Sequence, residues 1–313
     1  MATDATLRGI GTYVPDARID NAERIARFDY DPEALETKIG IQRTARKAEG
    51  QETSDLCVEA FRALAERMGE ALDPDSLDLV VVVTQHPDGH GLPHTSAIVH
   101  GKLGLPKRCF AFDISLGCSG YVSALATVKG HLMATGRTRA VLITADPYSK
   151  SVSEEDKNTA MIFGDAATAS LIELGAADGW RIGAFDQGTD GSTHQALMRD
   201  AEGTLQMSGR GVFNFCALNV PKSVKTTLEL NGIDKEAVDA FVFHPGSKYI
   251  VDTISARVKI PAPATLDCAD YGNTVSSSIP LVLAGLSPKE HRTVFVSGFG
   301  VGLGWSSCVL TAT

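Results

Sequence analysis

The chain has 313 residues, of which 43% are hydrophobic, so it holds enough apolar material for one large core or two ordinary domains. Its formal net charge of -9, without a long lysine and arginine block, argues against nucleic acid as the main partner. No apolar run is long enough to span a bilayer, and residues 1–6 lack the basic and apolar regions of a signal peptide, so we expect a cytoplasmic protein. The six cysteines form no CxxC pair, which predicts neither a disulfide framework nor a cysteine zinc site.

Apolar periodicity predicts alternating helices and strands along the chain. Residues 55–68 have apolar side chains at helical spacing, and the continuous apolar run 77–83 is typical of a buried strand. The same order returns later, with a predicted helix over 220–230 and a strand over 238–244. The pattern therefore predicts an α/β fold.

Two pairs of similar segments indicate an internal duplication. Residues 72–83 align with residues 233–244, apolar on apolar and Asp on Asp, and residues 139–145 align with residues 292–298. Two copies of one α/β unit would bring equivalent loops together near a pseudo-twofold axis. The Gly/Asn/Ser turn at 271–280 is the approximate counterpart of the loop around Cys118, so we expect Asn273 to face Cys118.

The segment 112–121 enters a predicted helix through a sharp turn that carries Cys118. A helix amino terminus favours anions, so we expect a thiol with a lowered pKa and a nucleophilic role. The alternative is a small, buried, apolar cysteine. His244 ends an apolar strand and precedes Pro245, so it points to a cleft or is a core histidine. Asn273 on its own fits an ordinary turn.

Two further motifs have simpler explanations than ligand binding. The glycine run 298–304 alternates with period two and leads into a predicted strand, whereas a dinucleotide loop needs a helix next. Backbone N–H groups for an oxyanion, or tight packing, explain it better. Histidines 86, 90, 94 and 100 lie in a segment broken by proline and glycine, which argues against a metal site. We expect neither metal nor cofactor.

With these residues placed, the chain resembles the β-ketoacyl-acyl carrier protein synthase III family of the thiolase superfamily. The likeness covers nearly the whole length, in segments 9–15, 38–43, 112–121, 161–169, 244–247, 272–274 and 298–304. It implies a thiolase-like α/β fold of two duplicated halves, residues 1–173 and 174–313, in five α-β-α-β-α layers. It also implies a homodimer.

The resemblance further implies a ping-pong decarboxylative Claisen condensation. Cys118 would take an acyl group from a thioester, with backbone N–H groups of Cys118 and Gly302 as the oxyanion hole. His244 and Asn273 would stabilise the enolate formed when malonyl-acyl carrier protein loses CO2. Thiolate chemistry suits this reaction, because sulfur is both a good nucleophile and a good leaving group.

The positions at which this sequence differs from the family pattern concern recognition of the acyl donor. Ala34 stands where a tryptophan often meets the adenine of coenzyme A, and Lys38 matches a nearby arginine. Lys248 is expected to replace an arginine that contacts the carrier protein, and Lys157 stands near another basic position. We therefore expect an acyl carrier protein thioester or an unusual acyl donor. Leu92 matches a position that reaches the neighbouring subunit's acyl pocket, or else packs locally.

Two alternatives to a condensing enzyme stay open. A related acyltransferase would pass the acyl group from Cys118 to a hydroxyl or amine without decarboxylation, and the presence of Asn273 argues against it. A non-catalytic partner subunit of the same fold would typically lack the cysteine, so Cys118 argues against that as well.

Overall fold

The computed structural model describes residues 4–265 and 267–313 as an α/β protein built on one long mixed sheet. From one edge to the other the sheet contains β11 (Ala240–Phe243), β12 (Thr293–Gly300), β13 (Gly304–Ala312), β8 (Trp180–Thr189), β1 (Ala5–Tyr13), β7 (Ala167–Leu174), β6 (Arg139–Ala145), β4 (Leu79–Val83) and β5 (Phe110–Ile114). The helices around this sheet are α3 (Thr53–Met68), α4 (Thr95–Leu103), α5 (Gly120–Thr135), α6 (Gly209–Asn231), α7 (Lys248–Val258) and α8 (Ser278–Ala284).

The two halves of the sheet repeat one pairing pattern. β4 runs parallel to β6, which is followed by antiparallel β7 and β1; β11 runs parallel to β12, which is followed by antiparallel β13 and β8. The pairs of similar segments fall on equivalent strands, β4 with β11 and β6 with β12. The halves join where β1 pairs with β8. The expected domain boundary after residue 173 falls at the end of β7.

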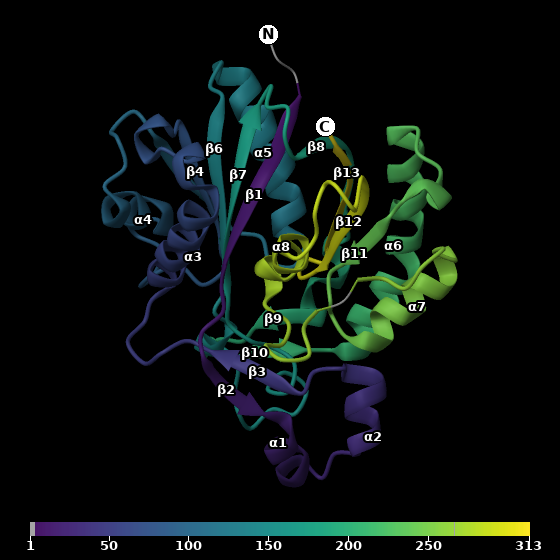
Figure 1. Cartoon of the computed structure of the whole chain (residues 1–313). Helices are drawn as coiled ribbons and strands as arrows, with labels where there is room; N and C mark the ends of the chain where they lie inside the picture. The colour runs from purple at the N-terminus through teal and green to yellow at the C-terminus, as the bar shows by residue number, and fades with distance from the viewer. Residues whose placement is uncertain (1–3, 266) are drawn as a thin grey trace.

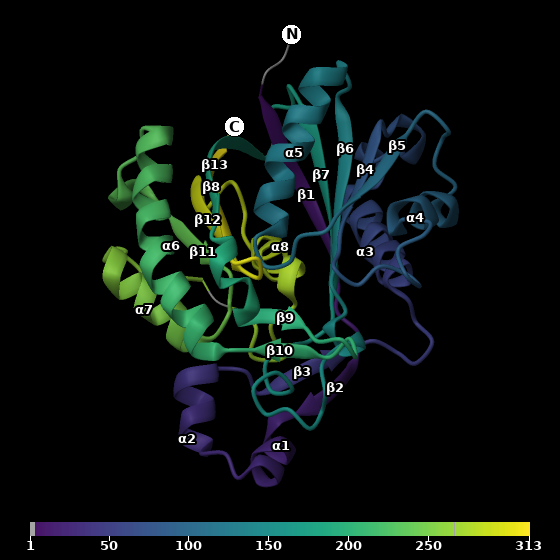
Figure 2. The same cartoon turned by 180° about the vertical axis from the view of Figure 1, so that it is seen from behind.

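Five layers result from how the helices cover this sheet (Figures 1 and 2). α3 packs on β1, β7 and β6 from one outer side, and α6 packs on β13, β8 and β12 from the other. α5 and α8 lie between the two halves and contact strands of both. The thiolase-like layering that the family resemblance implies is therefore confirmed.

The burial of apolar side chains explains why these segments form strands and helices. β4 reads Leu-Val-Val-Val-Val and is buried at every residue, as expected for a strand covered on both faces. α5 buries seven residues, from Gly120 to Leu132, because helices and strands surround it. α3 instead has one buried face and starts with a capping box between Glu52 and Asp55.

A smaller cap closes one end of the molecule (Figure 1). It contains β2 (Ala17–Asp20), α1 (Asn21–Phe28), α2 (Pro32–Ala34) and β3 (Arg43–Arg46), with the hairpin of β9 (Leu197–Arg199) and β10 (Leu205–Met207) beside it. Glu154 ties the cap to the segment before β7, because it accepts hydrogen bonds from buried Arg24 and from Arg46. No helix in the described part of the chain combines the length and apolar character needed to cross a bilayer.

Candidate active site

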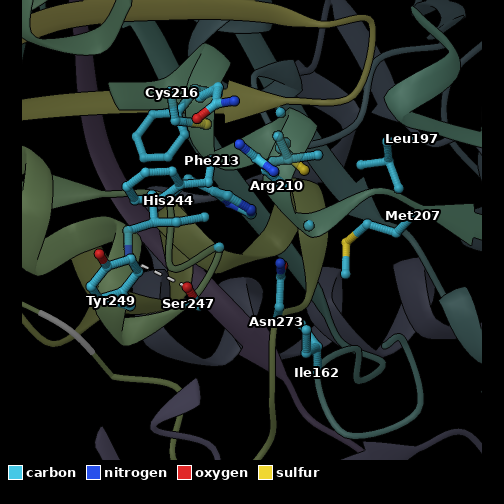
Figure 3. A pocket seen from close by; sticks show the side chains of 18 of the residues that line it. Ile162, Leu197, Met207, Arg210, Phe213, Cys216, His244, Ser247, Tyr249 and Asn273 are labelled. Atoms are coloured by element: carbon cyan, nitrogen blue, oxygen red, sulfur yellow. Dashed lines mark hydrogen bonds between the residues drawn. The ribbon is translucent and has the colours of Figure 1, made fainter. Parts of the chain in front are cut away.

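A pocket of about 730 Å³ opens between the cap and the C-terminal half, and it contains all three residues singled out as catalytic candidates. Cys118 comes from the turn before α5, His244 from the end of β11, and Asn273 from the loop before α8. Figure 3 shows the labelled lining side chains around the cavity. The three candidates, far apart in sequence, therefore share one cavity, as the predicted duplication requires.

Cys118 lies at the deep end of this pocket with 4% of its surface exposed. Burial, with a smaller contribution from the negative charge of Asp146, raises the pKa of its thiol to about 12. Backbone N–H groups of Val301 and of Cys118 itself favour the thiolate but offset only part of this effect. The prediction of a lowered thiol pKa is wrong for the unliganded protein, because desolvation outweighs the helix terminus.

The C-terminal glycines allow the chain to approach Cys118 closely. A Cβ at Gly300 would lie 2.7 Å from Cys118 Sγ, and one at Gly298 would lie 2.5 Å from the Cys118 carbonyl oxygen. Gly300 also has a φ of 151°, which L side chains rarely adopt. Both sequence-based explanations of the glycine run therefore apply: it packs tightly and it presents a backbone N–H, that of Val301, to the sulfur.

His244 is buried without a hydrogen-bond partner for either ring nitrogen in the described residues. Its backbone is fixed, since its N–H donates to the Ser297 carbonyl oxygen at 2.9 Å. The ring meets Phe299 edge-on, with centroids 5.9 Å apart. Burial lowers the pKa of His244 to about 3, so the imidazole is neutral at pH 7. An unsatisfied neutral imidazole facing a pocket is ready to bond a ligand.

Asn273 is held in place through its backbone and its side-chain oxygen. Its N–H donates to the Ile162 carbonyl oxygen at 2.8 Å, and its carbonyl oxygen accepts from Gly164 N–H at 3.0 Å. Its Oδ1 accepts from Val275 N–H at 2.9 Å. Val275 has a φ of 56°, which is strained for a β-branched residue. The loop thus leaves the amide NH2 group of Asn273 as a donor toward the cavity (Figure 3).

The four predicted binding residues lie in different places. Lys38 lines the pocket, whereas Lys157 is exposed and does not. Lys248 is also outside the lining, and its Nζ forms an ion pair with Asp252 at 2.5 Å. Leu92 is 94% exposed and does not line this pocket within the single chain.

Sequence reasoning missed several lining residues. Arg210, Phe213 and Cys216 lie on the first two turns of α6, and Tyr249 lies on α7. The spacing of positions 209, 213 and 216 indicates that they share one helical face. The neighbouring sequence does not indicate that this face lines a cavity. Tyr249 was visible only as the residue beside Lys248.

The chain matches known proteins over its whole length. Residues 112–191 match the family described as 3-oxoacyl-[acyl-carrier-protein (ACP)] synthase III, and residues 228–312 match its C-terminal domain. The β-ketoacyl-[acyl-carrier-protein] synthase III of Cereibacter sphaeroides is 34% identical, with 99% of each chain covered.

Solved structures agree with the sequence matches. A crystal structure of a 3-oxoacyl-(acyl-carrier-protein) synthase III superposes with a TM-score of 0.91 at 30% identity, covering 99% of this chain and 100% of that one. The 3-oxoacyl-(acyl-carrier protein) synthase of Burkholderia xenovorans gives 0.90 at 30% identity, with 99% and 95% covered. The chain therefore belongs to the 3-oxoacyl-[acyl-carrier-protein] synthase III family.

Proposed function

We propose that this protein is a condensing enzyme that joins an acyl group, held on Cys118, to a malonyl-acyl carrier protein with loss of CO2. The observation that carries the proposal is the convergence of a thiol, an unpartnered imidazole and an oriented amide donor in one buried pocket. The names of the matched relatives support the same reaction.

The first half-reaction is a thioester exchange. The Cys118 sulfur attacks the donor's carbonyl carbon, the bond from that carbon to the donor sulfur breaks, and the thiol proton leaves with the released thiol. Because the resting thiol is neutral, its proton must move as the bond forms, and neutral His244 in the same pocket can carry it. The N–H groups of Cys118 and Val301 favour negative charge on the sulfur, which supports the same two groups as the oxyanion hole, with Val301 in the role expected of Gly302.

The second half-reaction forms the new carbon–carbon bond. The malonyl thioester loses CO2, and the electron pair of the broken bond gives an enolate whose oxygen bonds to His244 and to the Asn273 amide. The enolate carbon attacks the acyl-Cys118 carbonyl, and the Cys118 thiolate departs and takes up one proton. Two donors that act only as charge develops are worth about 3 kcal/mol each.

The side chains that line the pocket limit which acyl donors can bind. Its deep lining is apolar, with Leu197, Val212, Phe163 and Phe299 all buried, which favours an uncharged acyl group. Ala34 is buried and offers no aromatic face to an adenine ring. These features favour a donor carried by acyl carrier protein over acyl-coenzyme A.

We also propose that the protein is a cytoplasmic homodimer. β5 is an edge strand with Phe110 51% exposed, and Leu116 and Leu92 nearby in the chain are 38% and 94% exposed. An uncovered edge with apolar side chains favours pairing with a second copy. The six unpaired cysteines fit a reducing compartment. Light scattering during size-exclusion chromatography would detect the dimer, and a monomer at micromolar concentration would contradict it.

The deciding experiment is the intact mass of the protein after incubation with acyl-carrier-protein and acyl-coenzyme A thioesters. We expect one acyl group on the wild type, none on Cys118→Ala, and one on Cys216→Ala, which removes the other thiol lining the pocket. Addition of malonyl-acyl carrier protein should then discharge the acyl-enzyme and release CO2. A folded protein that no thioester acylates would overturn the proposal.

A further inference from the structure

A cluster of polar side chains lies behind Cys118, outside the lining of the pocket. It comes from the segments that follow β4 and β6, and we call it the polar wall; its members are Gln85, His86, Tyr148 and Ser151. Because β4, β5 and β6 are parallel, these segments and the turn that carries Cys118 leave the sheet at the same edge. The polar wall therefore adjoins the nucleophile from the N-terminal half, whereas the pocket lies toward the C-terminal half.

Internal hydrogen bonds fix the polar wall. The Tyr148 hydroxyl donates to Gln85 Oε1 at 2.8 Å, and His86 Nε2 lies 2.8 Å from Ser151 Oγ. The His86 and Tyr148 rings are in contact, with centroids 4.6 Å apart, and both side chains are buried. Burial raises the pKa of Tyr148 well above its usual range, and the nearby Cys118 sulfur adds to this effect, so the hydroxyl is a neutral donor.

Gln85 contacts the turn that carries the nucleophile. A Cβ added at Gly117 would lie 2.5 Å from Gln85 Oε1, so the amide packs directly on the residue before the reactive cysteine. The Gln85 backbone is held on both sides, because its N–H donates to Asp146 Oδ1 at 2.6 Å and its carbonyl oxygen accepts from Arg199 at 3.1 Å. With Oε1 already bonded, the NH2 group of Gln85 is left without a hydrogen bond in the part of the chain that the structure describes.

The second half-reaction determines where the acyl tail can lie. The enolate forms at His244 and Asn273, and the arm of the malonyl thioester extends from there to the mouth of the pocket. Lys38 and Arg210 lie on the two walls of this mouth. An acyl tail that stayed in this path would block the malonyl thioester. The first carbons of the tail therefore leave the sulfur on the other side, along the polar wall.

An unbonded amide beside the tail selects among acyl groups. Next to an alkyl tail, the Gln85 NH2 group would lose water and gain no partner, which is unfavourable, whereas an oxygen on the tail would accept its hydrogen bond. A site built to bond a substrate oxygen rejects the analogue that lacks it. The buried carboxylate of Asp146, bonded to Gln85 N–H, disfavours a negatively charged tail, and Arg199 is exposed and screened by solvent. The oxygen is therefore an uncharged hydroxyl or carbonyl.

We propose that Gln85, positioned by Tyr148, determines specificity for acyl groups that carry an uncharged oxygen close to the thioester, such as 3-hydroxyacyl groups. Gln85 contacts the substrate, whereas Tyr148 is a positioning residue because it acts through the Gln85 amide. The inference rests on the proposed function, since it names the class of acyl group that Cys118 accepts.

The test compares butyryl-pantetheine with 3-hydroxybutyryl-pantetheine, which differ by one oxygen, through the rate of Cys118 acylation measured by intact mass. We expect wild type to prefer the hydroxylated donor in kcat/KM by about tenfold or more. Gln85→Met keeps the length of the side chain and removes the amide, so the preference should fall to within about threefold of unity. Tyr148→Phe should reduce it partly, because the amide then loses the bond that orients it.

The chain offers a second glutamine–tyrosine pair as a matched control. Gln51 Nε2 donates to the Tyr13 hydroxyl at 3.2 Å, and neither residue lines the pocket. Gln51→Met and Tyr13→Phe should keep the wild-type preference. If Gln85→Met lowered activity with both donors and kept their ratio, its role would be structural and the proposal would be overturned. A wild type that showed no preference, or that favoured succinyl-pantetheine, would also overturn it.

Binding to Cys118→Ala gives a readout without turnover. Calorimetry with the two pantetheine thioesters, with and without Gln85→Met, measures the same preference as a ratio of dissociation constants. Tighter binding of the hydroxylated thioester that depends on Gln85 would support the inference even if no thioester acylated the wild type, so failure of the proposed function is distinguished from failure of this inference. Equal affinities for the two thioesters would contradict it.

Discussion

The side-chain oxygen of Asn273 accepts the backbone N–H of Val275 at 2.9 Å, and this bond fixes which end of the amide faces the pocket. With Oδ1 engaged, the NH2 group is the part left to meet a ligand. Val275 makes the bond at a φ of 56°, a conformation that costs about 1–3 kcal/mol for a non-glycine residue. The fold therefore strains its backbone at the point that orients a proposed catalytic donor.

Asn273→Ala should separate the two half-reactions. We expect Cys118 to be acylated at close to the wild-type rate, because Asn273 is assigned to the enolate and not to the first transfer. Malonyl-dependent condensation should fall by about 10²–10³, the usual effect of losing one such donor. Single-turnover acylation measured by intact mass, beside release of labelled CO2, reports the two steps independently. Full condensation activity in this variant would remove the role assigned to the amide.

Gly300→Ala should displace the nucleophile. The added Cβ would lie 2.7 Å from Cys118 Sγ, and the residue's φ of 151° is unfavourable for alanine. We expect acylation to slow by at least about tenfold and the melting temperature to fall by several degrees. Gly191→Ala is the control, because a Cβ there meets no atom within 4 Å. If both variants were acylated at the same rate and melted at the same temperature, the close approach of Gly300 to Cys118 would not matter for activity or stability.

Most of the fold could be predicted from the sequence, because the duplication is visible as similar local patterns of apolar residues. The apolar runs at 77–83 and 238–244 fall on β4 and β11, and the sequence repeat alone aligns them. The three candidates Cys118, His244 and Asn273 were found for the same reason, since each lies at the end of a recognisable strand or turn.

Properties set by packing could not be predicted in this way. The position of Cys118 before a helix indicated an acidic thiol, but its pKa depends on how completely Phe299 and its other neighbours exclude water. Arg210 lies on an exposed helix start, and only the tertiary structure shows that this start forms the mouth of the pocket. Lys248 was chosen by its sequence position, whereas Asp252, one turn later, neutralises it.

Alkylation of Cys118 should reflect a neutral thiol. With a pKa of about 12, the thiolate fraction rises tenfold for each pH unit across the accessible range. We expect the rate of iodoacetamide modification at Cys118, followed by peptide mass mapping, to increase in this way from pH 7 to 9 without levelling. A plateau below pH 8 would indicate an activated thiolate and contradict the burial argument.

His244 should make the protein less stable in acid. Its pKa falls from an ordinary 6.5 to about 3 on folding, so between these values the unfolded chain binds a proton that the folded chain does not. The associated stability is present above pH 6.5 and is lost as the pH falls toward 3, by about 1.3 kcal/mol per pH unit. Urea unfolding at pH 7, 6 and 5 should show a steeper decline for wild type than for His244→Gln. Parallel declines would mean that His244 titrates normally.

Asp146 couples the nucleophile to the Asn273 loop, and its charge should influence Cys118. The fully buried carboxylate accepts from Gln85 N–H at 2.6 Å and from Ser276 Oγ at 2.5 Å, and its negative charge raises the Cys118 pKa.

Asp146→Asn keeps the shape of the side chain but removes the charge, so the thiol should ionise more easily and react with iodoacetamide about threefold faster at pH 8, which corresponds to roughly half a pKa unit. Asp165→Asn is the matched control: Asp165 is equally buried and hydrogen-bonded, to Ser149 and Lys47, but does not act on Cys118. A faster reaction in both variants would point to loosened packing instead of charge, and unchanged rates in both would show that the Asp146 charge does not reach the sulfur.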